Sequence, residues 1–465
     1  MSLADLRDSI VALAYIVATI LFILGLRDLS SPRTARHGNR LAAIGMFVAL
    51  VATLMHRDVT SFWIIGIGLP IGAVLGLVSA RRVAMTAMPQ MVALFNGAGG
   101  ATAALVSVAE YMRASGAGDA KVSMGAAAVT GLVIGSVSFT GSLIAFAKLQ
   151  ELMSSSPLRF PGNRVFNLLL LVACIVLGWR VSTGVGGMGE LGIITALALV
   201  LGATGTLPIG GGDMPVVIAV VNSLTGLATA VTGMVLDNEM LIVAGMLVGA
   251  SGTLLTLLMS KAMNRSLASV LFGGFGAASG AVATGAVARE TRTTTPDDLA
   301  VALAYARRVA IVPGYGLAVA QAQRELQAIG NDLVARGVDV TFAIHPVAGR
   351  MPGHMNVLLA EANVPYERMV ELEQANAAFP DTDVVLIVGA NDVVNPAARE
   401  DKTSPIYGMP ILDADRARLA VVLKRGRSAG FAGIDNELFY RENTRMLYGD
   451  AKGSLAAIAE ALKTA

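Results

Sequence analysis

A glycine-rich segment in the C-terminal part is the region of the sequence best suited to bind a ligand. It reads Val312-Pro313-Gly314-Tyr315-Gly316-Leu317-Ala318-Val319 and joins an apolar run at 308 to 312 to an amphipathic stretch at 316 to 329. Glycines between a strand and a helix let a pyrophosphate approach backbone N–H groups closely. Many α/β turns need glycine for geometry alone, so Gly314, Gly316 and Val319 leave dinucleotide binding and simple turn formation equally open.

Two later strand ends indicate which cofactor such a turn would bind. An NAD(H) fingerprint places a carboxylate at the end of the second strand, about 20 residues on. Here that strand ends in His345-Pro346-Val347-Ala348-Gly349-Arg350, without a carboxylate. A later strand runs into Lys424-Arg425-Gly426-Arg427-Ser428-Ala429-Gly430-Phe431. Cations and a hydroxyl at a strand end suit a 2'-phosphate, which favours NADP(H); the alternative is a solvated cationic loop.

Strand-like and helix-like patterns alternate around these segments, which predicts a Rossmann-like parallel sheet with crossover helices over residues 296–465. The predicted helices cover 316 to 329 and 353 to 362. The predicted strands cover 308 to 312, 338 to 345, 384 to 388 and 419 to 423.

The first 265 residues have the composition of a membrane domain. The chain of 465 residues is 54% hydrophobic and only 15% charged, which exceeds the apolar content of a soluble chain. A span needs about 20 mostly apolar residues, so we predict a polytopic α-helical domain of about nine spans. They lie near 9 to 26, 38 to 55, 61 to 80, 88 to 112, 122 to 147, 164 to 180, 189 to 208, 213 to 236 and 239 to 262.

Charge and cysteine content exclude other classes. A net charge of +2 is too small to indicate a nucleic-acid partner. The single cysteine, Cys174, lies in an apolar segment and cannot form an intrachain disulfide or a multi-cysteine metal site. We interpret it as a buried hydrophobic residue and predict no metal site.

Two segments allow more than one interpretation. The stretch 9 to 26 is longer than the apolar region of a signal peptide, and Arg27 and Asp28 follow it where small residues would be expected, so we predict a retained helix. Residues 266–295 are rich in Gly, Ala, Ser and Thr, which predicts a flexible linker. Because residues 267 to 288 carry no charge, an interfacial or spanning helix is the alternative interpretation of this stretch.

Cationic loops predict the orientation. By the positive-inside rule the loops richer in Arg and Lys are cytoplasmic, which puts the N-terminus outside and the C-terminal domain in the cytoplasm. The richer loops carry Arg27, Arg33, Arg36, Arg40, Arg81, Arg82, Lys148, Arg159, Arg164, Lys261 and Arg265, and the other loops carry Arg57, Arg113, Lys121 and Arg180.

Polar residues within the apolar segments are candidates for a hydrated path. Asn96 and Asn222 lie inside predicted spans, and Asp213 lies at the predicted cytoplasmic mouth of its helix. Polar groups in lipid are costly and face helix interiors or water. The structural alternative is interhelical hydrogen bonding, worth roughly 0.6 to 2 kcal/mol, and residue type alone favours it.

Taken together, these segments resemble the beta subunit of bacterial proton-translocating NAD(P) transhydrogenases over essentially the whole chain. The resemblance implies a six-stranded parallel sheet that binds NADP(H) in an orientation reversed relative to ordinary dinucleotide folds. It also implies an inner-membrane location, an alpha subunit that binds NAD(H), and a homodimer of alpha–beta units. It rests on Pro313-Gly314-Tyr315-Gly316, His345-Pro346-Val347-Ala348-Gly349-Arg350-Met351-Pro352-Gly353, Gly389-Ala390-Asn391-Asp392 and Met446-Leu447-Tyr448-Gly449-Asp450-Ala451-Lys452.

The activity that the resemblance implies is hydride transfer from NADH to NADP+, driven by protons entering the cytoplasm through the membrane helices. Asp392 would sense protonation, and the path interpretation is then favoured for Asn222, is evenly balanced for Asn96 and extends to Asp213. The implied cofactor-binding residues are Gly314, Tyr315, Gly316, Val319, Val347, Ala348, Gly349, Arg350, Met351, Pro352, Gly389, Ala390, Asn391, Asp392, Val393, Gly408, Met409, Lys424, Arg425, Gly426, Arg427, Ser428, Ala429, Gly430, Phe431, Asp450 and Ala451.

Within that set the resemblance distributes the roles along the cofactor. Tyr315 and the loop 347–352 would wrap it, with Arg350 at the pyrophosphate. Residues 389–393 would lie near the nicotinamide, and 424–431 would hold the 2'-phosphate and form a lid. His345 could relay protons, but we interpret it as orienting its loop, and His354 and Glu361 receive no role.

The sequence departs from the family pattern at two positions. Asn96 stands where several relatives have an intramembrane histidine, and neither His37 nor His56 lies well inside a span. The proton relay is therefore expected to depend on the partner's helices. Gly426 stands where relatives often have a hydroxyl, which Ser428 could supply.

Two rival functions stay open on sequence grounds: an NADP(H)-sensing membrane transporter without redox activity, and a nucleotide-binding anchor for another enzyme. A transporter's midplane site often lies on broken helices. The predicted spans carry few internal charges, which disfavours the first rival.

The charge distribution predicts a topology that reporter fusions can test. Fusions after Arg40, Arg82 and Arg159 should give a cytoplasmic signal, and fusions after Arg57, Lys121 and Arg180 should report the opposite side. A cytoplasmic signal at Lys121 would contradict the nine-span arrangement.

Overall fold

The computed structural model describes residues 3–31, 33–56, 59, 61–116, 122–154, 156–158, 160–270, 289–351, 353–426 and 428–465. The chain divides into two compact units. One comprises Met1–Ile209 with Val217–Thr256, and the other Gly210–Val216 with Leu257–Ala465. The expectation of a linker or helix over 271 to 288 lies outside the described residues.

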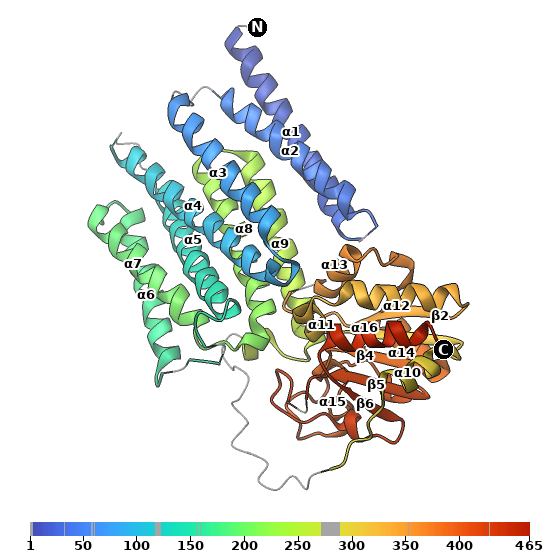
Figure 1. The fold of residues 1–465 in the computed structure, drawn as a ribbon. Coiled ribbons are helices and arrows are strands. Elements are labelled where there is room, and N and C mark those ends of the chain that lie inside the picture. The colour runs from blue at the N-terminus through green and yellow to red at the C-terminus, as the bar shows by residue number, and fades with distance from the viewer. Residues whose placement is uncertain are drawn as a thin grey trace. The chain divides into compact units, whose positions relative to one another are not determined.

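The first unit is built from long apolar helices (Figure 1). Nine helices in the described part of the chain are long and apolar enough to cross a membrane, which confirms a polytopic helical architecture. They are α1 (Leu3–Leu29), α2 (Ala35–Leu54), α3 (Phe62–Arg82), α4 (Met88–Gly116), α5 (Val122–Leu149), α6 (Asn163–Ser182), α7 (Met188–Thr206), α8 (Met214–Val235) and α9 (Glu239–Ala262).

Glycine determines how closely some of these helices approach. A Cβ added to Gly135 of α5 would lie 2.6 Å from the carbonyl oxygen of Gly100 in α4. Likewise, a Cβ on Gly245 of α9 would lie 2.7 Å from the carbonyl oxygen of Gly226 in α8. Small residues thus allow direct backbone contact in lipid. The similar glycine row of α3, which includes Gly72, has nothing within 4 Å of an added Cβ.

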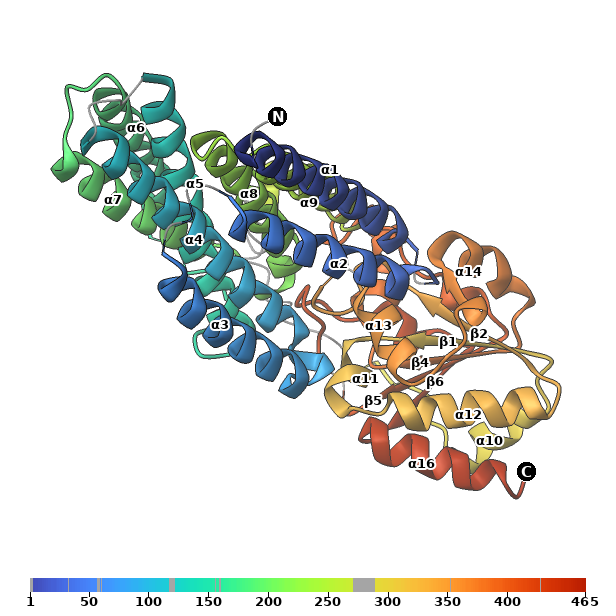
Figure 2. The same ribbon diagram turned by 90° about the horizontal axis from the view of Figure 1, so that it is seen from above.

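The second unit contains a six-stranded parallel sheet in the order β3-β2-β1-β4-β5-β6, as expected for a Rossmann-like domain (Figure 2). The strand order reverses between β1 and β4, and ligands of such sheets bind outside the strands' carboxyl ends at this reversal. The strands are β1 (Arg308–Pro313), β2 (Asp339–Ile344), β3 (Met369–Glu371), β4 (Val384–Val388), β5 (Leu419–Lys424) and β6 (Thr444–Tyr448).

Helices cover both faces of the sheet, with α12 and α16 on one side and α14 on the other (Figure 2). The α-helices of this domain are α10 (Pro296–Ala304), α11 (Tyr315–Ala320), α12 (Gln323–Ala335), α13 (His354–Glu361), α14 (Leu372–Ala378), α15 (Ala397–Glu400) and α16 (Ala451–Leu462). The short 3-10 turns used below are η2 (Gly211–Asp213), η5 (Phe379–Asp381) and η8 (Glu437–Tyr440).

The helix predicted over 316 to 329 is wrong in one respect, because the chain forms two helices there. Gln321 adopts a left-handed conformation with φ of +49° and ends α11. The N–H of Ala322 bonds back to the carbonyl of Leu317, which closes the helix end in the manner of a C-terminal cap. A second helix, α12, then begins at Gln323.

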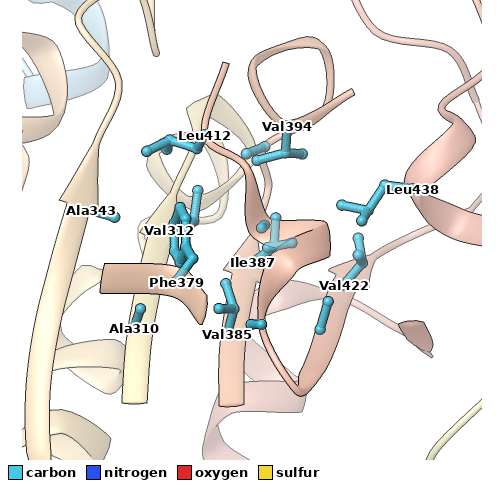
Figure 3. Packing of buried hydrophobic residues seen from close by; sticks show 14 of the residues in the cluster. Ala310, Val312, Ala343, Phe379, Val385, Ile387, Val394, Leu412, Val422 and Leu438 are labelled. Carbon is cyan, nitrogen blue, oxygen red and sulfur yellow. The ribbon is translucent and has the colours of Figure 1, made fainter. Parts of the chain in front are cut away.

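A single apolar cluster fills the space between the sheet and the α14 side (Figure 3). Alternate residues of the central strands point into it, such as Val385 and Ile387 of β4. Phe379 of η5, which is 1% exposed, packs against the same cluster. This apolar packing fixes the central strands relative to one another, and so fixes the positions of the loops at their carboxyl ends.

Candidate functional site

The carboxyl ends of β1 and β4 meet in direct backbone contact. The N–H of Gly314 donates to the carbonyl of Val388, and the N–H of Gly316 donates to the carbonyl of Gly389, both at 2.9 Å. A Cβ on Gly389 would lie 2.5 Å from the Gly316 Cα, and Gly389 has φ of +69°. Side chains at these positions would collide with backbone, so glycine is required by geometry.

A cavity of about 670 Å³ opens at this edge of the sheet, a size typical of cofactor sites. Of the residues expected to bind the cofactor, those that line it are Gly314, Tyr315, Gly316, Val319, Val347, Ala348, Gly349, Arg350, Gly389, Ala390, Asn391, Asp392, Val393, Met409, Lys424, Arg425, Gly426, Ser428, Ala429, Gly430, Phe431 and Ala451. Met351, Gly408 and Asp450 do not line it, and Pro352 and Arg427 lie outside the described residues.

The loop after β2 is held by two buried histidines. His345 Nδ1 accepts the N–H of Val347 at 3.3 Å, so its Nε2 carries the proton and donates to the carbonyl of Pro410 at 2.7 Å. Burial lowers the pKa of His345 to about 4, although the Pro410 carbonyl opposes the shift. These bonds confirm that His345 orients its loop.

His354 has a comparable role that the sequence did not indicate. Its Nδ1 accepts the backbone N–H of Arg350 at 3.0 Å, which fixes the turn at Gly349, where φ is +109°. Burial and the nearby Arg350 charge both lower the pKa of His354, so the ring stays a neutral acceptor. Arg350 in turn places its guanidinium 4.5 Å from the centre of the Tyr315 ring, within the range of a cation–π contact.

Asp392 lies where the loop after β4 meets the segment after β5. Its Oδ2 accepts the N–H of Ala432 at 3.0 Å, while its Oδ1 is buried and has no hydrogen-bond partner among the described residues. Burial raises the pKa of the Asp392 carboxyl, and the N–H groups of Ala432 and Phe431 and the Lys424 charge oppose that shift only in part. The carboxyl can therefore take up a proton more readily than an exposed one.

The ammonium of Lys424, one of the cations expected at the phosphate, already has partners within the domain. It donates to the carbonyl of Ser428 and lies 5.0 Å from the centre of the Phe439 ring. The hydrogen bonds of the Asn391 amide are satisfied when its oxygen faces Lys424 and Gly430. In this orientation the oxygen accepts from Lys424 Nζ at 3.0 Å and from the Gly430 N–H at 2.8 Å. Lys424 thus ties two loops together, whereas Arg425 is exposed at the cavity.

Asp450, which is expected at the cofactor, caps a helix in the structure. Its carboxylate is the N-cap of α16 and accepts the N–H groups of Lys452 and Gly453, at 3.1 and 3.3 Å. The neighbouring Ala451 lines the cavity, so Asp450 acts by positioning the start of α16.

Sequence reasoning missed several members of this site. Asn395 and Asn436 are almost fully buried and join the loop after β4 to the turn before β6. A buried asparagine beside proline or aspartate is a weak signal in sequence, because only the meeting of two distant loops gives it partners. Asn395 and Asn436 do not line the cavity themselves; the lining residues of the sheet domain that the sequence did not indicate are Ala320, Ile406, Leu423, Ala432 and Gly449.

In the membrane unit, Asn96 belongs to a polar cluster between helices. Its Nδ2 donates to Ser142 Oγ at 2.9 Å and to Ser138 Oγ at 3.4 Å. The Ser138 hydroxyl donates to the carbonyl of Val221 at 2.9 Å and lies 2.5 Å from Thr225 Oγ1. The cluster therefore links α4, α5 and α8.

Asn222 and Asp213 have different surroundings. Asn222 is half-buried, and its side chain makes no hydrogen bond within the described part of the chain. The described part of the chain therefore shows no interhelical hydrogen bond from Asn222, which was the structural alternative for this residue. Asp213, in η2, is fully buried and accepts two hydrogen bonds from Arg265, at 2.7 and 2.8 Å.

Known proteins resemble this chain over nearly its whole length. A family model described as NAD(P) transhydrogenase beta subunit matches residues 11–461. Two relatives, both from Rhodospirillum rubrum and one from a designated strain, carry the name NAD(P) transhydrogenase subunit beta. Each is 46% identical to this chain over 464 residues, which cover 98% of this chain and 100% of the relative.

The depressed pKa of His345 predicts acid sensitivity. The unfolded chain takes up a proton near pH 6.5 and the folded site only near pH 4, so stability is lost as the pH falls between these values. The loss should amount to roughly 3 kcal/mol. His345→Gln should flatten the pH profile in chemical denaturation of the sheet domain, and parallel profiles for the two proteins would contradict this account.

Proposed function

The chain belongs to the NAD(P) transhydrogenase beta subunit family, whose members are proton-translocating oxidoreductases, and we propose that its sheet domain binds NADP(H). The family implies hydride transfer coupled to proton translocation. When bound, the nicotinamide cofactors supply the hydride chemistry. The residues of this chain then bind, orient and enclose the cofactor, and no acid or base is required for the transfer itself.

The contact between the β1 turn and the end of β4 is the observation that carries this proposal. Gly314, Gly316 and Gly389 bring the two backbones so close that no Cβ fits between them, and this contact lies at the reversal of strand order where dinucleotides bind. We infer that the pyrophosphate lies beside this backbone contact, in the cavity that Gly314, Gly316 and Arg350 line. The helix that follows is only six residues long, so the backbone N–H groups matter more than a helix dipole.

The preference for NADP(H) rests on charge. The β2 end carries no carboxylate that would repel a 2'-phosphate, and Arg425 is exposed at the end of β5. We infer that Arg425 and Ser428 bind that phosphate. Lys424 contributes a nearby positive charge and, through its bond to the Ser428 carbonyl, holds the 424–431 segment in place. Tyr315 and Phe431, whose ring centres are 6.0 Å apart, would enclose the cofactor.

Asp392 is proposed to sense protonation next to the nicotinamide. The buried Oδ1 gains from a proton, because the neutral carboxyl removes a poorly solvated charge. Ionised Asp392 holds the N–H of Ala432 more strongly, which favours the closed lid. Protonation would therefore loosen the lid and release cofactor.

In the membrane unit, we propose that protons move past Asn222 and the Asn96 cluster. Hydroxyls and amides can hold a chain of water molecules, and Asn222 has no competing bond in the described region. Asp213 with Arg265 would mark the cytoplasmic end. The overall direction is NADPH formation driven by proton entry.

The assembly follows from the subunit name of the relatives, which implies an alpha subunit. We propose that this partner binds NAD(H), that two alpha–beta units pair, and that the complex lies in the bacterial inner membrane. The sheet domain would then face the cytoplasm, where both cofactors are present.

Arg425→Ala should weaken NADP+ binding to the purified full chain by about 10- to 150-fold, because a charge-assisted contact to phosphate contributes roughly 1.5 to 3 kcal/mol. Lys424→Ala should weaken it further by also freeing the lid. Arg418→Ala, just before the opposite end of the same strand, is the matched control. Titration calorimetry measures all three, and equal affinity of the unmutated chain for NAD+ and NADP+ would refute the assignment.

Asn222→Ala should slow proton pumping by the complete complex in vesicles by roughly 2- to 30-fold, the range of coupling mutations, while NADP(H) affinity stays unchanged. Asn167, whose Oδ1 accepts from Thr204 at 2.6 Å between α6 and α7, provides a control that loses an interhelical bond. Asn167→Ala should pump normally. Normal pumping by Asn222→Ala would place the path elsewhere.

A further inference from the structure

The end of the linker lies along the outer strand of the sheet. We call residues 289–295 the linker strap. The N–H of Met446 in β6 donates to the carbonyl of Arg292 at 2.7 Å, and the N–H of Thr294 donates back to the Met446 carbonyl at 3.0 Å. Thr293 and Met446 form a parallel bridge. The chain that leaves the membrane helices is therefore fastened to β6 before α10 begins.

The strap begins with a bidentate ion pair. Arg289 donates from one nitrogen to both carboxylate oxygens of Glu437, at 2.8 Å each, and its guanidinium lies 4.3 Å from the centre of the Tyr440 ring. The Arg289 and Glu437 side chains are 52% and 41% exposed. An exposed ion pair adds little to stability, so the position of this pair matters more than its strength.

Both aromatic and acidic partners of Arg289 belong to one short segment, residues 435–440, which includes η8. The opposite side of this segment is tied to the loop after β4. Asn436, 1% exposed, donates from Nδ2 to the carbonyl of Asn391 at 2.9 Å and accepts the Leu438 N–H at 2.9 Å. Asn395 accepts the N–H of Glu437 at 3.2 Å.

These hydrogen bonds connect the 435–440 segment to residues that line the cavity, at the end proposed for the nicotinamide. Asn391 precedes Asp392, whose carboxylate accepts the N–H of Ala432, the residue that follows the 424–431 segment. Asn436 and Asn395 are buried, so a bond lost by displacement of the 435–440 segment could not be replaced by water. A shift of the strap that moved this segment would therefore break or strain these buried bonds and displace the 389–395 loop.

We propose that Arg289 is a positioning residue through which the linker strap sets the 389–395 loop and hence the affinity for NADP(H). This inference rests on the proposed NADP(H) site and adds a route by which the linker reaches it. The strap holds the 435–440 segment from one side, and Asn436 and Asn395 pass its position to the loop on the other.

The test uses the complete complex of alpha and beta subunits in vesicles. Arg289→Ala should change the KM for NADP(H) about three- to ten-fold, leave the KM for NAD(H) unchanged, and reduce by a similar factor the response of NADP+ affinity to an imposed proton gradient. The charge swap Arg289→Glu with Glu437→Arg should restore much of that response. Glu437→Gln, nearly identical in shape, should behave like Arg289→Ala and guards against misfolding of the first variant.

Lys463→Ala is the matched control, because it breaks an exposed ion pair with Glu460 on α16, away from the strap. It should leave all three quantities unchanged. The inference is overturned if Arg289→Ala only lowers the melting temperature, or if its kinetic effects equal those of the control. In that case tight NADP(H) binding by the unmutated complex would still support the proposed function. If the unmutated complex did not prefer NADP(H) over NAD(H) at this site, the proposed function itself would be refuted.

Discussion

Two backbone segments touch at the carboxyl edge of the sheet, and this contact allows no side chain between them. Gly314 and Gly316 bond to the end of β4, and Gly389 turns away through a left-handed conformation. The contact places the turn after β1 and the loop after β4 against each other, so the residues that follow each strand line the same cavity. Tyr315 on one side and Asp392 on the other owe their positions to it.

Buried polar groups then determine how the loops around that contact behave. His345 and His354 stay neutral and hold one loop by accepting N–H groups, whereas Asp392 and Lys424 are charged groups whose burial disfavours the charge. The first loop is therefore firm near neutral pH. Protonation of Asp392 or loss of charge on Lys424 would therefore alter the contacts between the loops that these two residues join.

The sequence predicted the elements with strong local signals and missed those that depend on distant partners. Long apolar runs identified the membrane helices and the central strands β1, β4 and β5. Strand β3 has only three residues, and the edge strand β6 mixes polar with apolar residues, so neither stood out. The inward direction of Lys424 and the role of Asn436 follow from loops that meet only in the folded domain.

The linker strap also has a consequence for the solubility of the sheet domain. An exposed strand edge offers unpaired N–H and carbonyl groups to other chains and so promotes aggregation. Here β3 ends one side of the sheet with three residues, and the strap pairs with Met446 on the other. A fragment that began after Thr294 would lose the bridge to Met446 and leave that part of the β6 edge unpaired. The linker strap thus covers part of an edge that would otherwise be free to pair with another chain.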